Sequence, residues 1–189
     1  MNYTFIIPFY NEDQNVLTLN DEIINNIKKI KDEKRNFEII YIDDGSSDNT
    51  FDKLKKLNTN NIDTTIIRHR INMSQSAALN TGISHSKYEN LIILDGDLQN
   101  DPNDINKMID EFEKGADMVI GWRKNRKDNF FLRSLPSIVA NFIVRIFSKS
   151  KIHDHGCAFK IVKKNTIDEL TNWGDFHRLL AARLANNGY

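Results

Sequence analysis

The 189-residue sequence predicts a single α/β domain with a Rossmann-like, mostly parallel sheet flanked by helices. The length fits one domain, and hydrophobic residues make up 40% of the chain, which is enough for a packed core. Short β-branched runs alternate with longer segments of helical periodicity. Because parallel strands need crossover connections, this alternation indicates βαβ units wound on both faces of the sheet.

Five short apolar runs are the predicted strands. In chain order they are Tyr3–Phe9, Phe37–Ile42, Thr64–Arg68, Leu91–Leu94 and Met118–Gly121. Between the first two, the segment Asn15–Lys31 predicts an amphipathic helix with Val16, Leu19, Ile23, Ile27 and Ile30 on one side. After the fourth strand, Asp101 and Pro102 predict a helix cap followed by a first-turn proline, and Asp104 adds an acid to that turn.

The composition excludes several classes of protein. The 26 basic and 26 acidic residues cancel, which argues against a basic protein that coats nucleic acid. The single cysteine, Cys157, cannot form an internal disulfide, and neither a cysteine cluster nor an HExxH motif is present to hold zinc. The amino terminus lacks a basic segment followed by a long apolar stretch, so we expect no signal peptide or anchor there and a cytoplasmic location.

The neutral total conceals two oppositely charged segments. Residues 95–117 hold eight acids against two lysines, and residues 123–133 hold five bases against one aspartate. Adjacent segments of opposite sign suggest a pocket where a cation, an anion and their ligands meet.

Polar clusters follow three of the predicted strands. They are Pro8–Glu12, Asp43–Ser47 and Asp95–Gln99. Because ligands of open α/β sheets bind outside the carboxyl ends of the strands, we expect these clusters to face one crevice.

Asp95 and Asp97 are the candidate metal ligands. Two carboxylates two residues apart can hold one hard divalent cation, Mg²⁺ or Mn²⁺, and leave positions free for phosphate oxygens. The intervening Gly96 lets the backbone bend or approach a neighbour closely. The alternative is that the pair only forms a turn or a cap.

Asp43 and Asp44 also allow two interpretations. They can belong to a simple turn with a helix cap at Ser47 or Asp48. They can also bind a ligand, because carboxylates suit the donor edge of a base and ribose hydroxyls. Adjacent acids repel unless a ligand or a hydrogen-bond donor separates them, which favours a function.

Taken together, six motifs carry a resemblance to a known family. They are PFYNE, IDDGSSDNT, HRINMSQSAALNTGI, LDGDLQNDP, GWRKNRKD with LRSLPS, and DHGCAFK. In this order the chain resembles the family 2 glycosyltransferases of the GT-A fold from Tyr3 to about Tyr189. The subgroup it resembles most is the polyprenyl-phosphate glycosyltransferases, typified by dolichol-phosphate mannosyltransferase.

The resemblance implies a site in two parts. Residues 1–121 are the implied nucleotide-sugar and metal half, and residues 122–189 are the implied acceptor half. The nucleotide-sugar pocket is implied at Pro8, Tyr10, Glu12, Asp43, Asp44 and Asp95. The metal ligands are implied at Asp95, Asp97 and Gln99, and the acceptor phosphate site at Arg123, Arg133 and Ser137. The implied catalytic residues are Asp95, Asp97, Arg123 and Arg133.

The implied reaction is an inverting, metal-dependent transfer of a sugar from a UDP- or GDP-sugar to undecaprenyl or dolichyl phosphate, at the cytoplasmic face of a membrane. A phosphate monoester with a second pKa near ~6 is mostly a dianion at neutral pH and needs no general base. Three alternatives stay open. They are a glycan hydroxyl acceptor with Asp154 as base, a catalytically silent sugar-nucleotide-binding module, and a haloacid-dehalogenase-type phosphatase. The last is disfavoured because its aspartate pair normally follows the first strand.

The chain also departs from the family pattern. Ser74 and Ala158 stand where the family usually has glycine. His177 and Arg178 match a family pair but also suit a helix surface. The apolar spacing of Leu135–Phe147 predicts a helix that packs in the core or lies at a membrane surface. Family members continue into a further basic loop and often into transmembrane helices, so we expect the acceptor half to be truncated.

Overall fold

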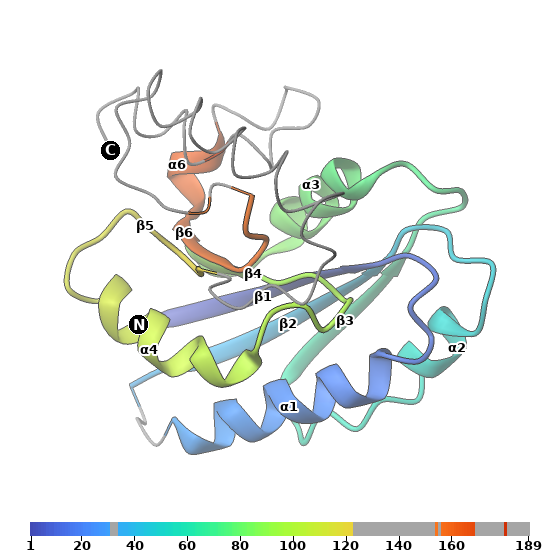
Figure 1. Ribbon diagram of the computed structural model, residues 1–189, viewed down its shortest axis with the longest axis horizontal. Helices are drawn as coiled ribbons and strands as arrows, with labels where there is room; N and C mark the ends of the chain where they lie inside the picture. Colours follow the sequence, from blue (N-terminus) through green and yellow to red (C-terminus); the bar gives the residue numbers. More distant parts are fainter. Residues whose placement is uncertain (31–33, 123–153, 155, 169–179, 181–189) are drawn as a thin grey trace, which may run out of the picture.

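The computed structural model describes residues 1–30, 34–122, 154, 156–168 and 180, and these form one α/β domain around a six-stranded sheet (Figure 1). The strands are β1 (Asn2–Phe9), β2 (Asn36–Asp43), β3 (Asp63–Arg68), β4 (Asn90–Ile93), β5 (Met118–Ile120) and β6 (Lys160–Lys163). Their order across the sheet is β3-β2-β1-β4-β6-β5. The five predicted strands are therefore confirmed, each within two residues of its expected bounds.

The sheet is mostly parallel, as predicted. Strands β3, β2, β1 and β4 run in one direction. Strand β6 lies antiparallel between β4 and β5, so it is the one strand of the sheet that the sequence analysis missed. It brings the last part of the DHGCAFK motif beside β4, whose end carries the aspartate pair.

Helices cover both faces of the sheet. They are α1 (Val16–Lys29), α2 (Thr50–Leu54), α3 (Gln75–His85), α4 (Ile105–Phe112) and α6 (Lys164–Asp168), with a 3-10 turn at Pro102–Asp104. Figure 1 shows α1 and α4 on one side of the sheet and α3 and α6 on the other. This arrangement confirms the doubly wound architecture.

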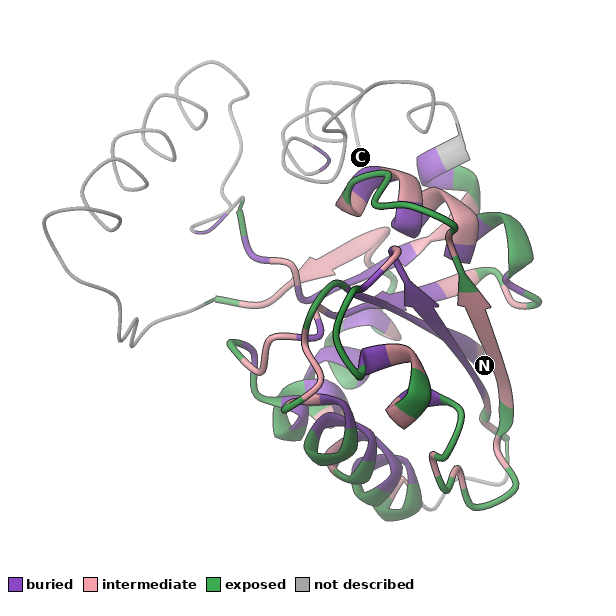
Figure 2. Cartoon of the chain, turned by 90° about the vertical axis from the view of Figure 1, so that its right-hand side faces the viewer, coloured by how far each residue is buried: buried purple, intermediate pink, exposed green. Residues whose placement is uncertain are grey.

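Alternation along β1 divides the core into two clusters. Phe5 and Ile7 pack with the apolar side of α1, including Leu19 and Ile23, whereas Ile6 packs with α3 on the opposite face. The central strands are buried, whereas the edge strand β3 is only half-buried (Figure 2). The helix predicted at Asn15–Lys31 is α1, and its apolar stripe is buried as the spacing indicates.

The predicted cap after the fourth strand is also confirmed. Asp101 accepts a hydrogen bond from the backbone N–H of Asn103 at 2.9 Å, and Pro102 opens the 3-10 turn that leads into α4. This cap fixes where the chain leaves the aspartate segment and turns back along the sheet.

In the part of the chain that the structure describes, no helix combines the length and the apolar character needed to cross a membrane. The predicted helix Leu135–Phe147 and the basic segment Arg123–Arg133 lie outside the described residues, as do His177 and Arg178.

Candidate functional site

A pocket of about 390 Å³ opens at the carboxyl ends of β1, β2 and β4. It is lined by Pro8, Phe9, Tyr10, Glu12, Asp44, Asn72, Ser74, Gln75, Asp95, Gly96 and Asp97. Figure 2 looks onto this end of the sheet. Four of these described lining residues are acids and none is Lys, Arg or His, so the pocket wall is strongly negative. The three polar clusters predicted to share one crevice therefore all contribute to it.

Hydrogen bonds tie the loop after β1 to the loop after β2. The backbone N–H of Asp44 donates to the carbonyl oxygen of Phe9 at 2.8 Å. The N–H of Asn11 donates to Ser46 Oγ, and the N–H of Glu12 donates to Thr50 Oγ1, each at 2.9 Å. The hydroxyl groups of Ser46, in the second cluster, and of Thr50, at the start of α2, thus act as acceptors that hold the first cluster in place.

Glu12 lies near the aspartate pair. Asn15 Nδ2 donates to Glu12 Oε2 at 2.5 Å, which orients the carboxylate. Burial raises the pKa of Glu12, and the nearby carboxylates of Asp97 and Asp48 raise this pKa further, although the Asn15 hydrogen bond opposes them. Like charges that raise the pKa of an acid are charges that a bound cation would relieve.

Asp43 and Asp44 have different roles although they are neighbours in sequence. Asp43 is fully buried, accepts a hydrogen bond from the N–H of Ser46 at 3.1 Å and forms an ion pair with Arg68 Nε at 3.1 Å. Asp44 is 2% exposed and lines the pocket. The structure thus places Asp44 in the predicted nucleotide pocket and Asp43 behind it, because successive side chains of a strand point to opposite faces.

Gly96 is required by the close approach of the aspartate segment to β1. A Cβ at this position would lie 2.5 Å from Phe9 Cδ1 and 3.0 Å from the carbonyl oxygen of Pro8. The prediction that Gly96, between the two aspartates, allows the backbone to approach a neighbouring segment closely is therefore confirmed.

Two glutamines beside the aspartate pair have different positions. Gln75 Nε2 donates to Asp95 Oδ1 at 2.6 Å, so Gln75 orients the first aspartate. The backbone N–H of Gln99 donates to Asp97 Oδ1 at 3.0 Å, but the exposed Gln99 does not line the pocket. Leu98, between Asp97 and Gln99, adopts a left-handed φ of 58°, which turns the chain away after Asp97.

The donor set fits a divalent cation held partly by a ligand. Asp95 and Asp97 offer carboxylate oxygens on an open wall, which Mg²⁺ and Mn²⁺ prefer. In the described ranges no group of three or more His, Cys, Asp or Glu side chains is close enough to hold a metal by itself. Phosphate oxygens and water would therefore complete the coordination shell.

The loop between β3 and α3 supplies Asn72 and Ser74, and Gln75 is the first residue of α3. None of the three was predicted from the sequence to line the pocket. Ser74 has φ 86° and ψ 155°, a backbone conformation that glycine adopts with little strain. Ser74, which stands where the family usually has glycine, was the feature of the sequence that could have indicated that this loop lines the pocket. The long motif HRINMSQSAALNTGI contains all three residues.

The predicted acceptor residues Arg123, Arg133 and Ser137 lie outside the described residues. Asp154, the alternative general base, is buried at 3% exposure and does not line the pocket.

A doubly wound sheet whose strand ends gather acids around one open pocket has its candidate site where open α/β sheets bind their ligands. The model of the family "Glycosyl transferase family 2" matches residues 4–171 of the chain. The chain belongs to this family, and it is a glycosyltransferase domain.

Two curated relatives match most of the chain. The dodecaprenyl-phosphate galacturonate synthase of Rhizobium johnstonii is 34% identical over 187 residues, which cover 98% of this chain and 54% of that relative. The undecaprenyl-phosphate 4-deoxy-4-formamido-L-arabinose transferase of Proteus mirabilis is 30% identical over 168 residues, which cover 87% and 50%. The chain thus spans about half the length of these relatives.

A solved structure has the same fold. The mannosyltransferase PcManGT from Pyrobaculum calidifontis, in complex with GDP-Man and Mn²⁺, superposes with a TM-score of 0.68 at 19% identity and covers 99% of this chain and 52% of that one. The GT-A fold predicted from the sequence is therefore confirmed.

Proposed function

We propose that the chain transfers a sugar from a nucleotide diphosphate sugar to a polyprenyl phosphate, with inversion at the anomeric carbon and with a bound Mg²⁺ or Mn²⁺. The observation that carries this proposal is the convergence of Glu12, Asp44, Asp95 and Asp97 on one pocket. Support for the acceptor comes from the two curated relatives, whose names both specify a polyprenyl phosphate. Support for the donor and metal comes from the GDP-Man and Mn²⁺ bound to the solved relative.

The donor occupies the described pocket in this proposal. Pro8 and Tyr10 form its wall, and Asp44 accepts a hydrogen bond from the base or the ribose. Asp95, oriented by Gln75, and Asp97 hold the cation, with Gln99 as the ligand that the family resemblance adds. The cation supplies Lewis-acid stabilisation of the departing diphosphate, a contribution of several kcal/mol.

The acceptor binds the second half, residues 122–189, in this proposal. Arg123 and Arg133 orient the lipid phosphate together with Ser137, because guanidinium groups suit phosphate oxygens. The phosphate dianion is its own nucleophile, so no side chain needs to remove a proton. Because the acceptor is a lipid, we place the reaction at the cytoplasmic face of a membrane.

The proposal is tested by incubating the chain with radiolabelled UDP- and GDP-sugars, Mn²⁺ and undecaprenyl phosphate in detergent, followed by organic extraction. We expect label in the lipid phase, and we expect chelation of the metal to abolish it. As a matched pair, Asp97→Asn should lose transfer and Asp104→Asn, on the exposed 3-10 turn, should keep it. Label only in a soluble glycan would favour a hydroxyl acceptor, and donor binding without transfer to any acceptor would favour a silent binding module.

A further inference from the structure

Two consecutive basic residues, Arg68 at the end of β3 and His69 just after it, contact the two acids at the end of β2. Arg68 pairs with the buried Asp43, and His69 contacts Asp44. The parallel register places Arg68 opposite Asp43, and the N–H of His69 donates to the carbonyl oxygen of Asp43 at 2.9 Å. The adjacent acids therefore each lie beside a basic side chain, Asp43 in an ion pair with Arg68 and Asp44 in a hydrogen bond with His69.

His69 links Asp44 to helix α3. Its side chain is 9% exposed, with Nδ1 2.7 Å from Asp44 Oδ1 and Nε2 2.9 Å from Thr81 Oγ1. An ionised carboxylate only accepts hydrogen bonds, so the Nδ1 hydrogen lies toward Asp44. The Thr81 hydroxyl can donate to Nε2 or accept from it, and it fixes the plane of the imidazole ring in either case.

The same carboxylate oxygen of Asp44 receives a second donor. The backbone N–H of Met73 donates to Asp44 Oδ1 at 2.9 Å. Both hydrogen bonds that this carboxylate makes with described residues thus use Oδ1, which leaves Oδ2 for a ligand. Two donors on one oxygen fix the rotation of the carboxylate at the pocket wall.

We propose that His69, supported by Thr81, is a positioning residue for recognition of the nucleoside part of the donor. It fixes the rotation of the Asp44 carboxylate so that Oδ2 accepts a hydrogen bond from an N–H of the base or from a ribose hydroxyl. This inference rests on the proposed function, because it assumes that a nucleoside diphosphate occupies the pocket. His69 lies behind Asp44 and is not itself among the lining residues.

The test is calorimetric titration of the full chain with UDP and with GDP in the presence of Mn²⁺. Loss of a hydrogen bond to a charged group predicts that His69→Leu weakens nucleotide binding about 10- to 100-fold. His69→Asn should recover most of this loss, because its amide N–H can occupy the position of Nδ1–H. In an Asp44→Asn background, His69→Leu should cause no further loss. The matched control is His85→Leu, an exposed histidine at the end of α3, which should bind like the wild type.

Three outcomes would overturn the inference. The first is wild-type affinity in His69→Leu, and the second is an equal additional loss in the Asp44→Asn background. The third is a His69→Asn variant as weak as His69→Leu, which would show that the histidine only maintains packing. Thermal unfolding of each variant accompanies the titrations. A wild-type chain that binds neither UDP nor GDP would overturn the proposed function as well, and so the two failures are distinguishable.

Discussion

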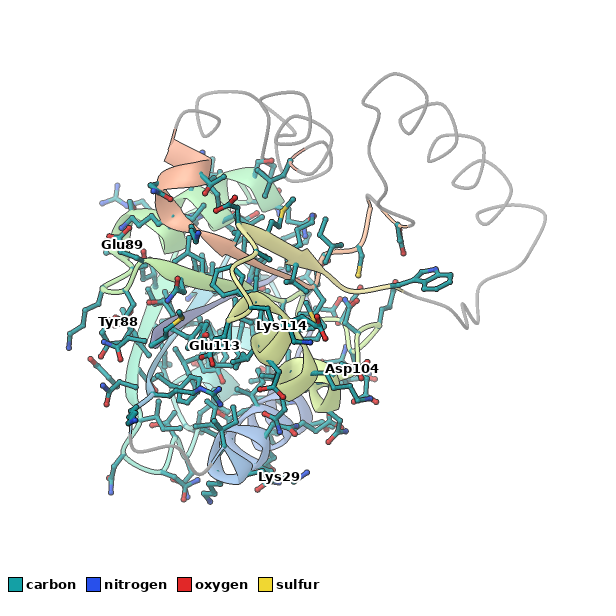
Figure 3. The ribbon with its side chains drawn as sticks, turned by 90° about the vertical axis from the view of Figure 1, so that its left-hand side faces the viewer. Lys29, Tyr88, Glu89, Asp104, Glu113 and Lys114 are labelled. Carbon is teal, nitrogen blue, oxygen red and sulfur yellow. The ribbon has the colours of Figure 1, made fainter. Side chains whose placement is uncertain are left out.

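The pocket at the carboxyl end of the central sheet and the acid Glu113 at its amino end differ in the charged side chains beside them. At the carboxyl end, the described residues that line the pocket include four acids and no Lys, Arg or His. At the amino end, Glu113, which is labelled in Figure 3, directly follows α4. It accepts hydrogen bonds from Arg35 and from the hydroxyl of Tyr3. The distances are 2.6 Å from Arg35 Nη2 to Glu113 Oε2 and 2.8 Å from Tyr3 Oη to Glu113 Oε1.

The pKa values of Glu113 at the amino end and Glu12 at the carboxyl end shift in opposite directions. Hydrogen bonds from Arg35 hold the pKa of Glu113 below its usual range, and the bond from Tyr3 acts in the same direction. At the pocket, burial and neighbouring carboxylates raise the pKa of Glu12. We infer that the amino end stabilises the domain, whereas the carboxyl end keeps charge available for a ligand at some cost in stability.

Non-glycine residues with positive φ occur at both ends of the sheet, and Asn60 and Asn61, with φ values of 50° and 64°, lie just before β3 at the amino end. Asn11, Ser74 and Leu98 have φ values of 54°, 86° and 58°, and all three lie in loops at the carboxyl end. Such conformations cost free energy in residues other than glycine, and they persist where the surrounding structure holds them.

The largest expected effect tests the function assigned to the carboxyl end. Asp97→Asn should lower the rate of sugar transfer at least about 100-fold, because loss of metal stabilisation raises the barrier by about 3 kcal/mol or more. The same change should not lower Tm, because it removes one of several like charges. A large fall in Tm with full activity per folded molecule would show instead that Asp97 stabilises the domain and is not needed for catalysis.

The next effect concerns the amino end. Glu113→Ala should destabilise the domain by about 2 kcal/mol, because it removes charged hydrogen bonds to Arg35 and Tyr3. For a chain of this size the expected fall in Tm is about 4–8 °C. Nucleotide affinity should stay unchanged. The control is Glu111→Ala in the last turn of α4, whose exposed pair with Lys114 should contribute less than about 1 kcal/mol.

A smaller effect, this time an increase in stability, is expected when the backbone strain at Ser74 is relieved. Ser74→Gly should stabilise the domain by about 1 kcal/mol, because glycine adopts this backbone conformation with little strain. The expected rise in Tm is about 2–4 °C. The matched variant Ser84→Gly, inside α3, should instead lower Tm. Equal effects of the two changes would contradict the assignment of strain to Ser74.

The smallest effect is the pH-dependent part of the Glu113 contribution. A carboxyl whose pKa is lowered by folding adds stability above its unfolded pKa, about 4.3 for glutamate, and loses it as pH falls through the folded pKa. The stability difference between wild type and Glu113→Ala should therefore be full at pH 7 and shrink below about pH 4. Urea unfolding at a series of pH values measures it, and a difference that grows on acidification would reverse the assigned sign.

Much of the fold followed from periodicity, and the exception is instructive. The long β-branched runs of β1 and β2 and the apolar stripe of α1 determine their elements almost to the residue. The missed strand β6 has only four residues, and lysines occupy both of its ends, so neither alternation nor hydrophobicity marks it. Its place in the sheet depends on pairing with β4 and β5, which lie distant in sequence.

The site divides in the same way. Residues within two positions of the end of a strand, such as Asp44 and Asp95, could be placed because the topology brings strand ends together. The sequence could not show that Asp43 is turned away from the pocket, since the two adjacent aspartates are chemically identical. Nor could it reveal the partners His69, which follows β3, and Gln75, which begins α3, because both act through side-chain contacts with residues distant in sequence.

The central claim is that the carboxylate pocket binds a nucleoside diphosphate together with a divalent cation. The most direct measurement is calorimetric titration of the chain with UDP and GDP, in Mn²⁺ and in excess chelator, for wild type, Asp97→Asn and Asp104→Asn. We predict binding of at least one nucleotide that requires Mn²⁺, disappears in Asp97→Asn and persists in Asp104→Asn. Equal affinity with and without the metal, or undiminished binding by Asp97→Asn, would contradict it.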